Sequence, residues 1–462
     1  MDNGIRDAKD KKEIRRQYIL TAPLLPLLVK MAIPTIIGML VTLIYNLTDT
    51  FFIGMLGNKS MTAAIGIAFS FISVIQAIGF WFGYGSGNAM SRSLGEGKDG
   101  DAEFFSSTAV VIAVVSGLIL SVFSIVFLNP LSSFIGGSAS ENLHIFTKEY
   151  LKVIATSIPF MLFSLVTYNQ FRLCGNVKDG MKGLLSGMLT NIILDPILMF
   201  GFKLGFIGAA YATLIGQIIG AAVLFALTGK NGNIGLNLKN VRFTRENIYH
   251  ILVGGLPNFA RQGITSLALV LLNMAAASFS EEVIAAFAVS SRIAAFSYML
   301  VIGWGQGFQP ICAMNYGAKQ YERVRKAFKY TVSIGTVFMS VSAMLLYVLA
   351  RPLTMVLSRN TGVINIGAEI LRLQCFSLPF LAYFATSSML MQNIGKYYSS
   401  LIISVSRQGI FYIPLLFALP FILGQRGLYM AQPAADLLAF LLAVWVVRNT
   451  FKSHSLFYHR ST

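Results

Sequence analysis

The chain has 462 residues, of which 55% are hydrophobic and 12% are charged, and its formal net charge is +17. A soluble domain carries about 25% charged residues, so this composition, with a mean hydropathy of +0.68, excludes an ordinary soluble protein. The lysines and arginines lie in short loops between apolar runs without interleaved aromatic residues, which is the positive-inside pattern of membrane proteins. We therefore expect contact with membrane lipid and no nucleic acid partner.

Twelve membrane-spanning helices are predicted from the apolar runs. Residues 1–18 are basic and lack a signal-peptide cleavage pattern, so we expect a cytoplasmic amphipathic segment that leads into the first span. A spanning helix needs about 20 apolar residues. Such runs lie near 27–56, 62–90, 105–128, 149–171, 182–202, 206–228, 248–278, 284–313, 328–350, 365–391, 397–421 and 427–448.

The loops between these runs alternate in charge. Basic residues are concentrated in the loops around 92–98, 172–182, 230–245 and 319–329, whereas the intervening loops are poor in them. The basic loops are expected on the cytoplasmic side. The alternation therefore predicts a multi-pass protein of the bacterial inner (cytoplasmic) membrane with both termini in the cytoplasm.

The second half of the chain repeats the first. Gly83, Gly85 and Gly95 align at one offset with Gly305, Gly307 and Gly317, and the SIPF motif at 157–160 resembles SLPF at 377–380. Upstream, Pro34 in AIPTIIG pairs with Pro257 in GLPNFAR. Because each unit has an even number of spans, both insert in the same orientation, as in transporters built from parallel repeats. We expect an N-lobe at 1–230, a cytoplasmic linker at 231–247 and a C-lobe at 248–462.

The repeated glycines suggest close packing. Small side chains at positions such as Gly85 and Gly307 let helices approach one another or bend. Two packed six-helix lobes would leave a cleft between them. The predicted fold is an all-α membrane protein of twelve transmembrane helices in two pseudo-symmetric lobes.

Ionisable residues at membrane depth are rare and point to function. Asp49 and Asp195 each lie about seven residues before the outer end of a predicted span, and Thr213 lies about seven residues into another. At 1.5 Å per residue, these positions share a depth of about 10 Å below the outer surface. Tyr45 shares a helix face with Asp49, and Asn191 shares one with Asp195, because each pair is four residues apart.

This group of oxygens has three interpretations. It could bind a small hard cation, or the two carboxyl groups could share a proton, since close carboxylates do not both ionise cheaply. Alternatively, the two aspartates could be helix-end residues wetted from outside. The spacing alone leaves all three open.

The chain resembles the multidrug and toxic compound extrusion (MATE) family of the MOP flippase superfamily. The resemblance rests on the IP–G–YN–TDTFFIG stretch of the first span, the LDP stretch of the fifth and the twofold six-helix repeat, and it covers nearly the whole chain. In one branch of the family the N-lobe binds Na⁺ or H⁺ through two aspartates, an asparagine, a tyrosine and a threonine. The resemblance implies that role for Asp49, Asp195, Asn191, Tyr45 and Thr213, with Asp49, Asn191 and Asp195 as metal ligands if the ion is Na⁺.

Some members of that family carry a second acidic cation site in the C-lobe, on the seventh and tenth spans. In this chain those spans contain no acid except Glu369 at the margin, so we expect no such site. Asp436 in the last span is the other C-lobe acid at membrane depth, and Arg407 is a possible partner for it.

Six further residues are candidates for a substrate cavity. Methionine and aromatic side chains form adaptable apolar pockets, and polar residues within the C-lobe spans could line the cleft. The candidates are Met39, Phe160, Met161, Tyr168, Arg292 and Gln306. All six are also compatible with ordinary packing.

The resemblance implies a secondary active exporter that acts by alternating access. Its substrates would be amphiphilic or cationic drugs, or a natural product that the cell makes itself. Antiport with Na⁺ or H⁺ would drive their export. The resemblance implies no other cofactor and a monomer whose partner is a small-molecule substrate. The nearest alternative is a lipid-linked oligosaccharide flippase of the same superfamily, which usually has fourteen spans and a strongly cationic cavity. A passive channel fits the two-lobe repeat less well.

A membrane enzyme is not expected, because no HExxH, GxSxG or other paired catalytic motif lies at membrane depth. The histidines His144, His250, His454 and His459 are expected in loops or tails. The three cysteines have no metal or disulfide spacing. The sequence leaves open the identity of the substrate and the choice between Na⁺ and H⁺.

Overall fold

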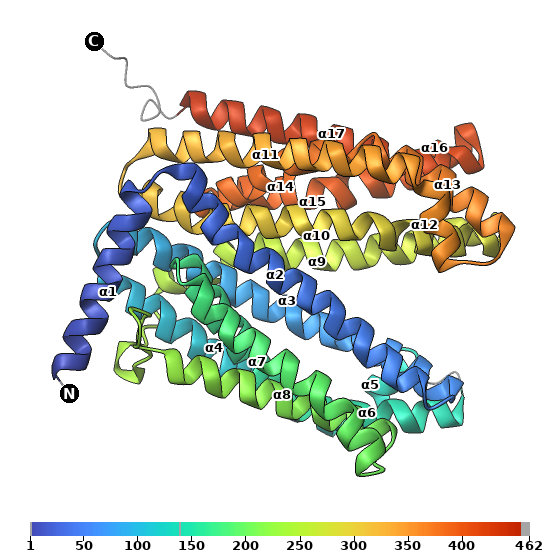
Figure 1. The fold of residues 1–462 in the computed structure, drawn as a ribbon, viewed down its shortest axis with the longest axis horizontal. Coiled ribbons are helices and arrows are strands. Elements are labelled where there is room, and N and C mark those ends of the chain that lie inside the picture. Colours follow the sequence, from blue (N-terminus) through green and yellow to red (C-terminus); the bar gives the residue numbers. More distant parts are fainter. Residues whose placement is uncertain (1, 138–139, 454–462) are drawn as a thin grey trace. The chain divides into compact units, whose positions relative to one another are not determined.

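The computed structural model describes residues 2–137 and 140–453 of the chain, and in this part it is helical and contains no strand (Figure 1). Eleven of its helices are long and apolar enough to cross a membrane, and a twelfth span results if one bent pair is counted as a single crossing. This confirms the predicted all-α membrane fold. Each of the twelve predicted apolar runs coincides with one of these segments.

The spans of the first half are six helices connected by short loops. They are α2 (Leu24–Gly54), α3 (Lys59–Gly95), α4 (Asp99–Val126), α6 (Glu141–Leu173), α7 (Val177–Pro196) continued by the π-helix η2 (Ile197–Gly201), and α8 (Phe206–Leu227).

The second half contains a bent span. Helices α13 (Thr361–Cys375) and α14 (Leu378–Asn393) meet at an angle of 55° around Ser377. The other spans are α9 (Arg245–Ala277), α10 (Glu281–Gly317), α11 (Tyr321–Val348), α15 (Tyr397–Val405) continued by the π-helix η4 (Ser406–Tyr412) and α16 (Ile413–Leu423), and α17 (Gln425–Ser453).

Shorter elements connect these spans, namely α5 (Leu128–Phe134), the 3₁₀ turn η3 (Leu238–Asn240) and α12 (Ala350–Leu357). The N-terminal helix α1 (Asp2–Thr21) is tied to two loops. Lys12 forms a 2.7 Å ion pair with Asp99, and Arg15 donates to the carbonyl oxygen of Gly232 at 3.2 Å. The basic lead-in is therefore held against the loops at the ends of α3 and α8.

Helix contacts divide the chain into two compact units. The first contains Met1–Thr21 and Ile37–Gly255, and the second contains Ala22–Ile36 and Leu256–Thr462. Helix α2 contributes to both: the Thr35 hydroxyl donates to the Gly303 carbonyl at 2.7 Å in the second unit, whereas Gly38 packs on Met181 in the first. Relative to the expected lobes, residues 22–36 group with the second half, and the linker 231–247 groups with the first half.

Glycines bring helices into backbone contact within each unit. A methyl group added to Gly85 of α3 would lie 1.9 Å from the Ile251 carbonyl oxygen of α9, and one added to Gly307 of α10 would lie 2.7 Å from Cα of Ala32. Real side chains never approach so closely, so only glycine fits. The expectation that these repeated glycines permit close helix approach is confirmed.

An apolar cluster in the first unit packs the ends of four spans together. Ile53, Ala64, Tyr150 and Phe206 are each no more than 3% exposed and pack together from α2, α3, α6 and α8. Tyr150 and Phe206 have ring centroids 5.1 Å apart. This cluster fixes the segment of α2 that carries Asp49 against α6 and α8.

Candidate functional site

Three helices of the first unit bring a group of polar side chains together. Helix α2 carries Tyr45 and Asp49, α7 carries Asn191 and Asp195, and α8 carries Thr213. The last four are 8%, 2%, 0% and 2% exposed, respectively. The five predicted residues therefore form one cluster, which we call the polar cluster; four of them are buried and Tyr45 is half-buried.

Asn191 occupies the centre of the polar cluster. Its side-chain amide lies 3.2 Å from the Thr213 hydroxyl and 3.5 Å from Oδ1 of Asp195. The hydroxyl of Tyr45 is within hydrogen-bonding reach of Thr213, and the carboxyl groups of Asp49 and Asp195 face each other within the same reach. These polar contacts link α2, α7 and α8.

Three oxygens of the polar cluster have no donor. Oδ1 of Asp49, Oδ1 of Asn191 and Oδ2 of Asp195 are buried and accept no hydrogen bond within the described part of the chain. Buried polar atoms are normally satisfied, and facing carboxylates repel each other unless a proton or a cation lies between them. Hard cations prefer such oxygen ligands. The donor set therefore fits a small monovalent cation or a shared proton.

Binding of a cation at the polar cluster would need the neutral side chains Asn191, Thr213 and Tyr45 as well as the two aspartates. Among the described residues, no three His, Cys, Asp or Glu side chains gather to hold a metal ion. An ion at the polar cluster would therefore be held by two carboxylates together with amide and hydroxyl oxygens.

Local backbone features position the cluster. Asp195 precedes Pro196, and the π-helix Ile197–Gly201 begins directly afterwards. Proline lacks an amide hydrogen, and π-turns inside helices are frequent at functional sites. A methyl group added to Gly216 would lie 2.7 Å from the Gly187 carbonyl oxygen. This close approach of α7 and α8 allows Asn191 to reach Thr213.

A sixth member, Tyr150, is not predicted from the sequence. This side chain of α6 is 1% exposed and interacts with Asp49 while its hydroxyl reaches toward Thr213. Tyr150 is far from the other members of the cluster along the sequence, so residue spacing does not predict its contact with them. The one indication in the sequence is that Tyr150 is a tyrosine within a predicted span, in its expected outer half, as Asp49 and Asp195 are in theirs.

Four of the six candidate substrate residues belong to the first unit and two, Arg292 and Gln306, belong to the second. Met161 and Tyr168 are buried, Phe160 is 39% exposed, and Gln306 is 4% exposed. Arg292 is exposed and Met39 is half-buried. None of the six lines the cavity described next, and their role in substrate binding stays a prediction.

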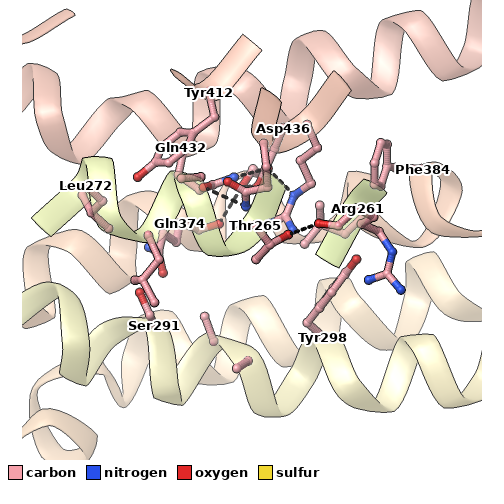
Figure 2. Close-up of a pocket in the computed structure, with 18 of the residues that line it drawn as sticks. Arg261, Thr265, Leu272, Ser291, Tyr298, Gln374, Phe384, Tyr412, Gln432 and Asp436 are labelled. Atoms are coloured by element: carbon pink, nitrogen blue, oxygen red, sulfur yellow. Dashed lines mark hydrogen bonds and ion pairs between the residues drawn. The ribbon is translucent and has the colours of Figure 1, made fainter. Parts of the chain in front are cut away.

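The second unit contains a cavity of about 380 Å³ between α9, α10, α13, α14, η4 and α17 (Figure 2). We call it the second-unit cavity. Its walls combine leucine and aromatic side chains with four glutamines, two arginines and one aspartate. The glutamines are Gln262, Gln374, Gln408 and Gln432. Its volume is within the range of small-molecule pockets.

One wall of this cavity carries a fully hydrogen-bonded carboxylate. Asp436 is 2% exposed and pairs with Nε of Arg407 at 2.7 Å, as the sequence had suggested. Gln432 donates to the same oxygen and Ser377 donates to the other, each at 2.7 Å (Figure 2). The charge of Asp436 is thus neutralised within the protein. The contacts arise because the break between α13 and α14 places Ser377 beside α17.

Two histidine expectations were wrong. His144 lies in α6, which begins eight residues before its predicted apolar run, and His250 lies in the first turns of α9, within the run predicted near 248–278. His454 and His459 lie outside the described residues. The three cysteines are buried and form no disulfide among the described residues, as expected of packing residues.

These features define a multi-pass helical membrane protein with a buried cluster of polar side chains in one unit and a polar cavity in the other. Comparison with known proteins gives its family. The MatE family profile matches residues 34–197 and 257–418, one segment in each half of the chain. The chain belongs to the MatE family, a family of transporters, and is not an enzyme.

Similar proteins cover almost the whole chain. The multidrug export protein MepA of Staphylococcus haemolyticus (strain JCSC1435) is 28% identical over 417 residues, which are 90% of this chain and 91% of the relative. MepA of Staphylococcus aureus (strain MSSA476) is 26% identical over 438 residues, which are 94% of this chain and 96% of the relative.

Solved structures share the fold. The outward-facing conformation of a multidrug resistance MATE family transporter of the MOP superfamily superposes with a TM-score of 0.87 at 22% identity, covering 94% of this chain and 97% of that one. A MOP superfamily transporter from Pyrococcus furiosus gives a TM-score of 0.87 at 22% identity, covering 95% and 98%. The resemblance drawn from the sequence is therefore confirmed at the level of family and fold.

Proposed function

We propose that this protein is a secondary active multidrug exporter, in which inward movement of Na⁺ or H⁺ drives the export of amphiphilic compounds. The single observation that carries the coupling is the pair of facing carboxyl groups of Asp49 and Asp195. A proton or cation bound between them offsets their repulsion, so ion binding and release change the charge of the polar cluster. The export of drugs is supported by the similarity to the two MepA proteins.

Each residue of the polar cluster would have a distinct role in binding the ion. Asp49 and Asp195 would supply the negative charge, while the side-chain oxygens of Asn191 and Thr213 would complete the ligand set. The Asn191 amide already donates to Thr213 at 3.2 Å, which leaves Oδ1 of Asn191 free to face an ion. Tyr45 and Tyr150 would enclose the cluster and limit access of water.

The protein would act as a monomer in a bacterial inner membrane, with both termini in the cytoplasm, in contact with lipid and with no nucleic acid partner. The basic loops at 172–182 and 319–329 support that orientation. Its substrates would be amphiphilic or cationic drugs, or a natural product that the cell makes itself. A lipid-linked oligosaccharide flippase is less well supported, because acids are buried in the first unit.

Transport by purified protein in proteoliposomes tests the proposal. Vesicles would be loaded with a fluorescent amphiphile, and its release would be followed under a Na⁺ gradient, a proton gradient, both gradients or neither. We expect release to follow one imposed ion gradient and to stop when an ionophore removes it. Equal release in the absence of any ion gradient would refute coupling, and would indicate a channel.

A further inference from the structure

The second-unit cavity contains one positive charge that no group among the described residues balances. Its walls carry two arginines and one aspartate. Asp436 is paired with Arg407 at 2.7 Å and accepts two further hydrogen bonds. The side chain of Arg261 forms no hydrogen bond or ion pair with any described residue. The guanidinium of Arg261 is therefore available to a ligand.

The arrangement distinguishes the two arginines. Arg407 is positioned by the π-helix η4, and its guanidinium lies 5.1 Å from the centre of the Tyr298 ring. The positive charge of Arg407 is therefore balanced by Asp436 and also contacts the Tyr298 ring. Arg261 lies on α9, at another part of the wall (Figure 2). Only Arg261 can compensate a negative charge that enters the cavity.

The remainder of the wall suits an aromatic or aliphatic body. Leu269, Leu272 and Leu381 supply apolar surface, and Phe384 and Tyr298 supply rings. Arginine binds carboxylates through two parallel hydrogen bonds, and such charge-assisted bonds are strong where water is excluded. A cation would meet an unbalanced like charge instead, which disfavours its binding.

We propose that the second-unit cavity binds amphiphiles that carry an anionic group, with Arg261 as the residue that engages the anion. Zwitterions with an apolar body belong to this class, whereas purely cationic amphiphiles do not. The inference rests on the proposed export function and narrows its substrate class. The anionic group can belong to a soluble compound or to a lipid headgroup, and the cavity volume of about 380 Å³ favours a compact soluble molecule.

Equilibrium binding to the full-length protein in nanodiscs tests this without any ion gradient, so a failure of transport coupling would leave the result intact. Three probes share one fluorophore: dansylglycine is an anion, its methyl ester is neutral, and dansylcadaverine is a cation. Fluorescence anisotropy would be measured in nanodiscs of phosphatidylcholine, with empty nanodiscs as the blank. We expect the wild type to bind dansylglycine at least tenfold more tightly than either other probe.

Substitutions at Arg261 locate the anion. Arg261→Gln should weaken dansylglycine binding about ten- to hundredfold, because a charge-assisted hydrogen bond is lost, and should leave the ester unchanged. Arg261→Lys should restore part of the affinity, since it keeps the charge but not the planar fork. The control Arg351→Gln removes the same charge from an exposed position of the second unit and should have no effect. Melting temperatures of all variants would show that each is folded.

Two outcomes would overturn the inference. One is equal dansylglycine affinity in the wild type and Arg261→Gln. The other is binding of dansylcadaverine or the ester as tight as that of the anion. A further arm adds phosphatidylglycerol to the nanodiscs: unchanged affinity supports a soluble ligand, whereas a tenfold loss that depends on Arg261 would assign the cavity to a lipid headgroup and overturn the assignment to a soluble one.

Discussion

The amide of Asn191 lies 3.2 Å from the hydroxyl of Thr213, and this contact joins α7 to α8 inside the first unit. The same amide reaches Asp195 one turn further along α7. Asn191 thereby holds one of the two acids in place relative to the neighbouring helix. The geometry of the polar cluster thus depends on a neutral residue, and the following predictions separate its contribution from that of the charges.

Neutralising either acid should abolish ion coupling without unfolding the protein. Asp49→Asn and Asp195→Asn keep the side-chain volume and remove one of two facing charges, so they leave no new repulsion. We expect gradient-driven efflux from proteoliposomes to fall to background. If the ion is Na⁺, millimolar Na⁺ should raise the melting temperature of the wild type by linkage but not that of either variant. Glu281→Gln at an exposed position is the matched control, and wild-type efflux in both aspartate variants would contradict the assignment.

Removing the Thr213 hydroxyl should weaken ion binding moderately. Thr213→Val keeps the shape and deletes the acceptor of the Asn191 amide, at a cost of about 1 kcal/mol. The ion concentration for half-maximal transport should therefore rise about fivefold, with little change in the maximal rate. Thr213→Ser retains the hydroxyl and should behave as the wild type. Equal behaviour of the valine and serine variants would remove Thr213 from the site.

Close packing of α7 and α8 should be required for the site. In Gly216→Ala the new methyl group would meet the Gly187 carbonyl oxygen at 2.7 Å, so the helices must separate and Asn191 must move away from Thr213. We expect a lower melting temperature and loss of ion-dependent efflux. Gly66→Ala provides the control, because nothing lies within 4 Å of that position and alanine is the better helix former. A Gly216→Ala protein with normal ion affinity would show that helix separation is not coupled to the cluster.

Replacing one member of the buried Arg407–Asp436 pair should lower the stability of the protein more than replacing both members. Asp436→Asn leaves the Arg407 charge without its 2.7 Å partner, and such a loss costs about 3–5 kcal/mol. Replacing both residues, in Asp436→Asn with Arg407→Gln, removes the uncompensated charge and should recover much of the stability. Thermal unfolding in detergent measures the double-mutant cycle. Additive effects of the two changes would show that the pair does not act as a unit.

Hydropathy was sufficient to predict the spans, because length and apolarity are dictated by the bilayer. The bend in the tenth span is not predicted by hydropathy, although the motif SLPF at 377–380 contains a proline. The related SIPF at 157–160 lies within the continuous helix α6. The two prolines therefore have different consequences, and tertiary contacts such as that of Ser377 with Asp436 distinguish them. Sequence spacing carries no information about such contacts.

The polar cluster was accessible from sequence for a different reason. Two pairs of residues four apart, at equal depth from the expected surface, restrict where their side chains can lie. Tyr150 lacked such a partner on its own helix and was missed. The second-unit cavity was missed because Arg261, Tyr298 and Asp436 come from three helices far apart in the chain, and because the π-helix that positions Arg407 has no sequence signature.

The repeat has a mechanical consequence. Within α2 and α9 the chain passes from one compact unit to the other, between Ile36 and Ile37 and between Gly255 and Leu256. Pro34 and Pro257, which the repeat pairs, each lie within two residues of such a crossing and remain inside the helix. A proline removes one backbone hydrogen bond and so lowers the bending stiffness of the helix at that point. The repeat thus places a locally softened point inside α2 and another inside α9, one in each half of the sequence.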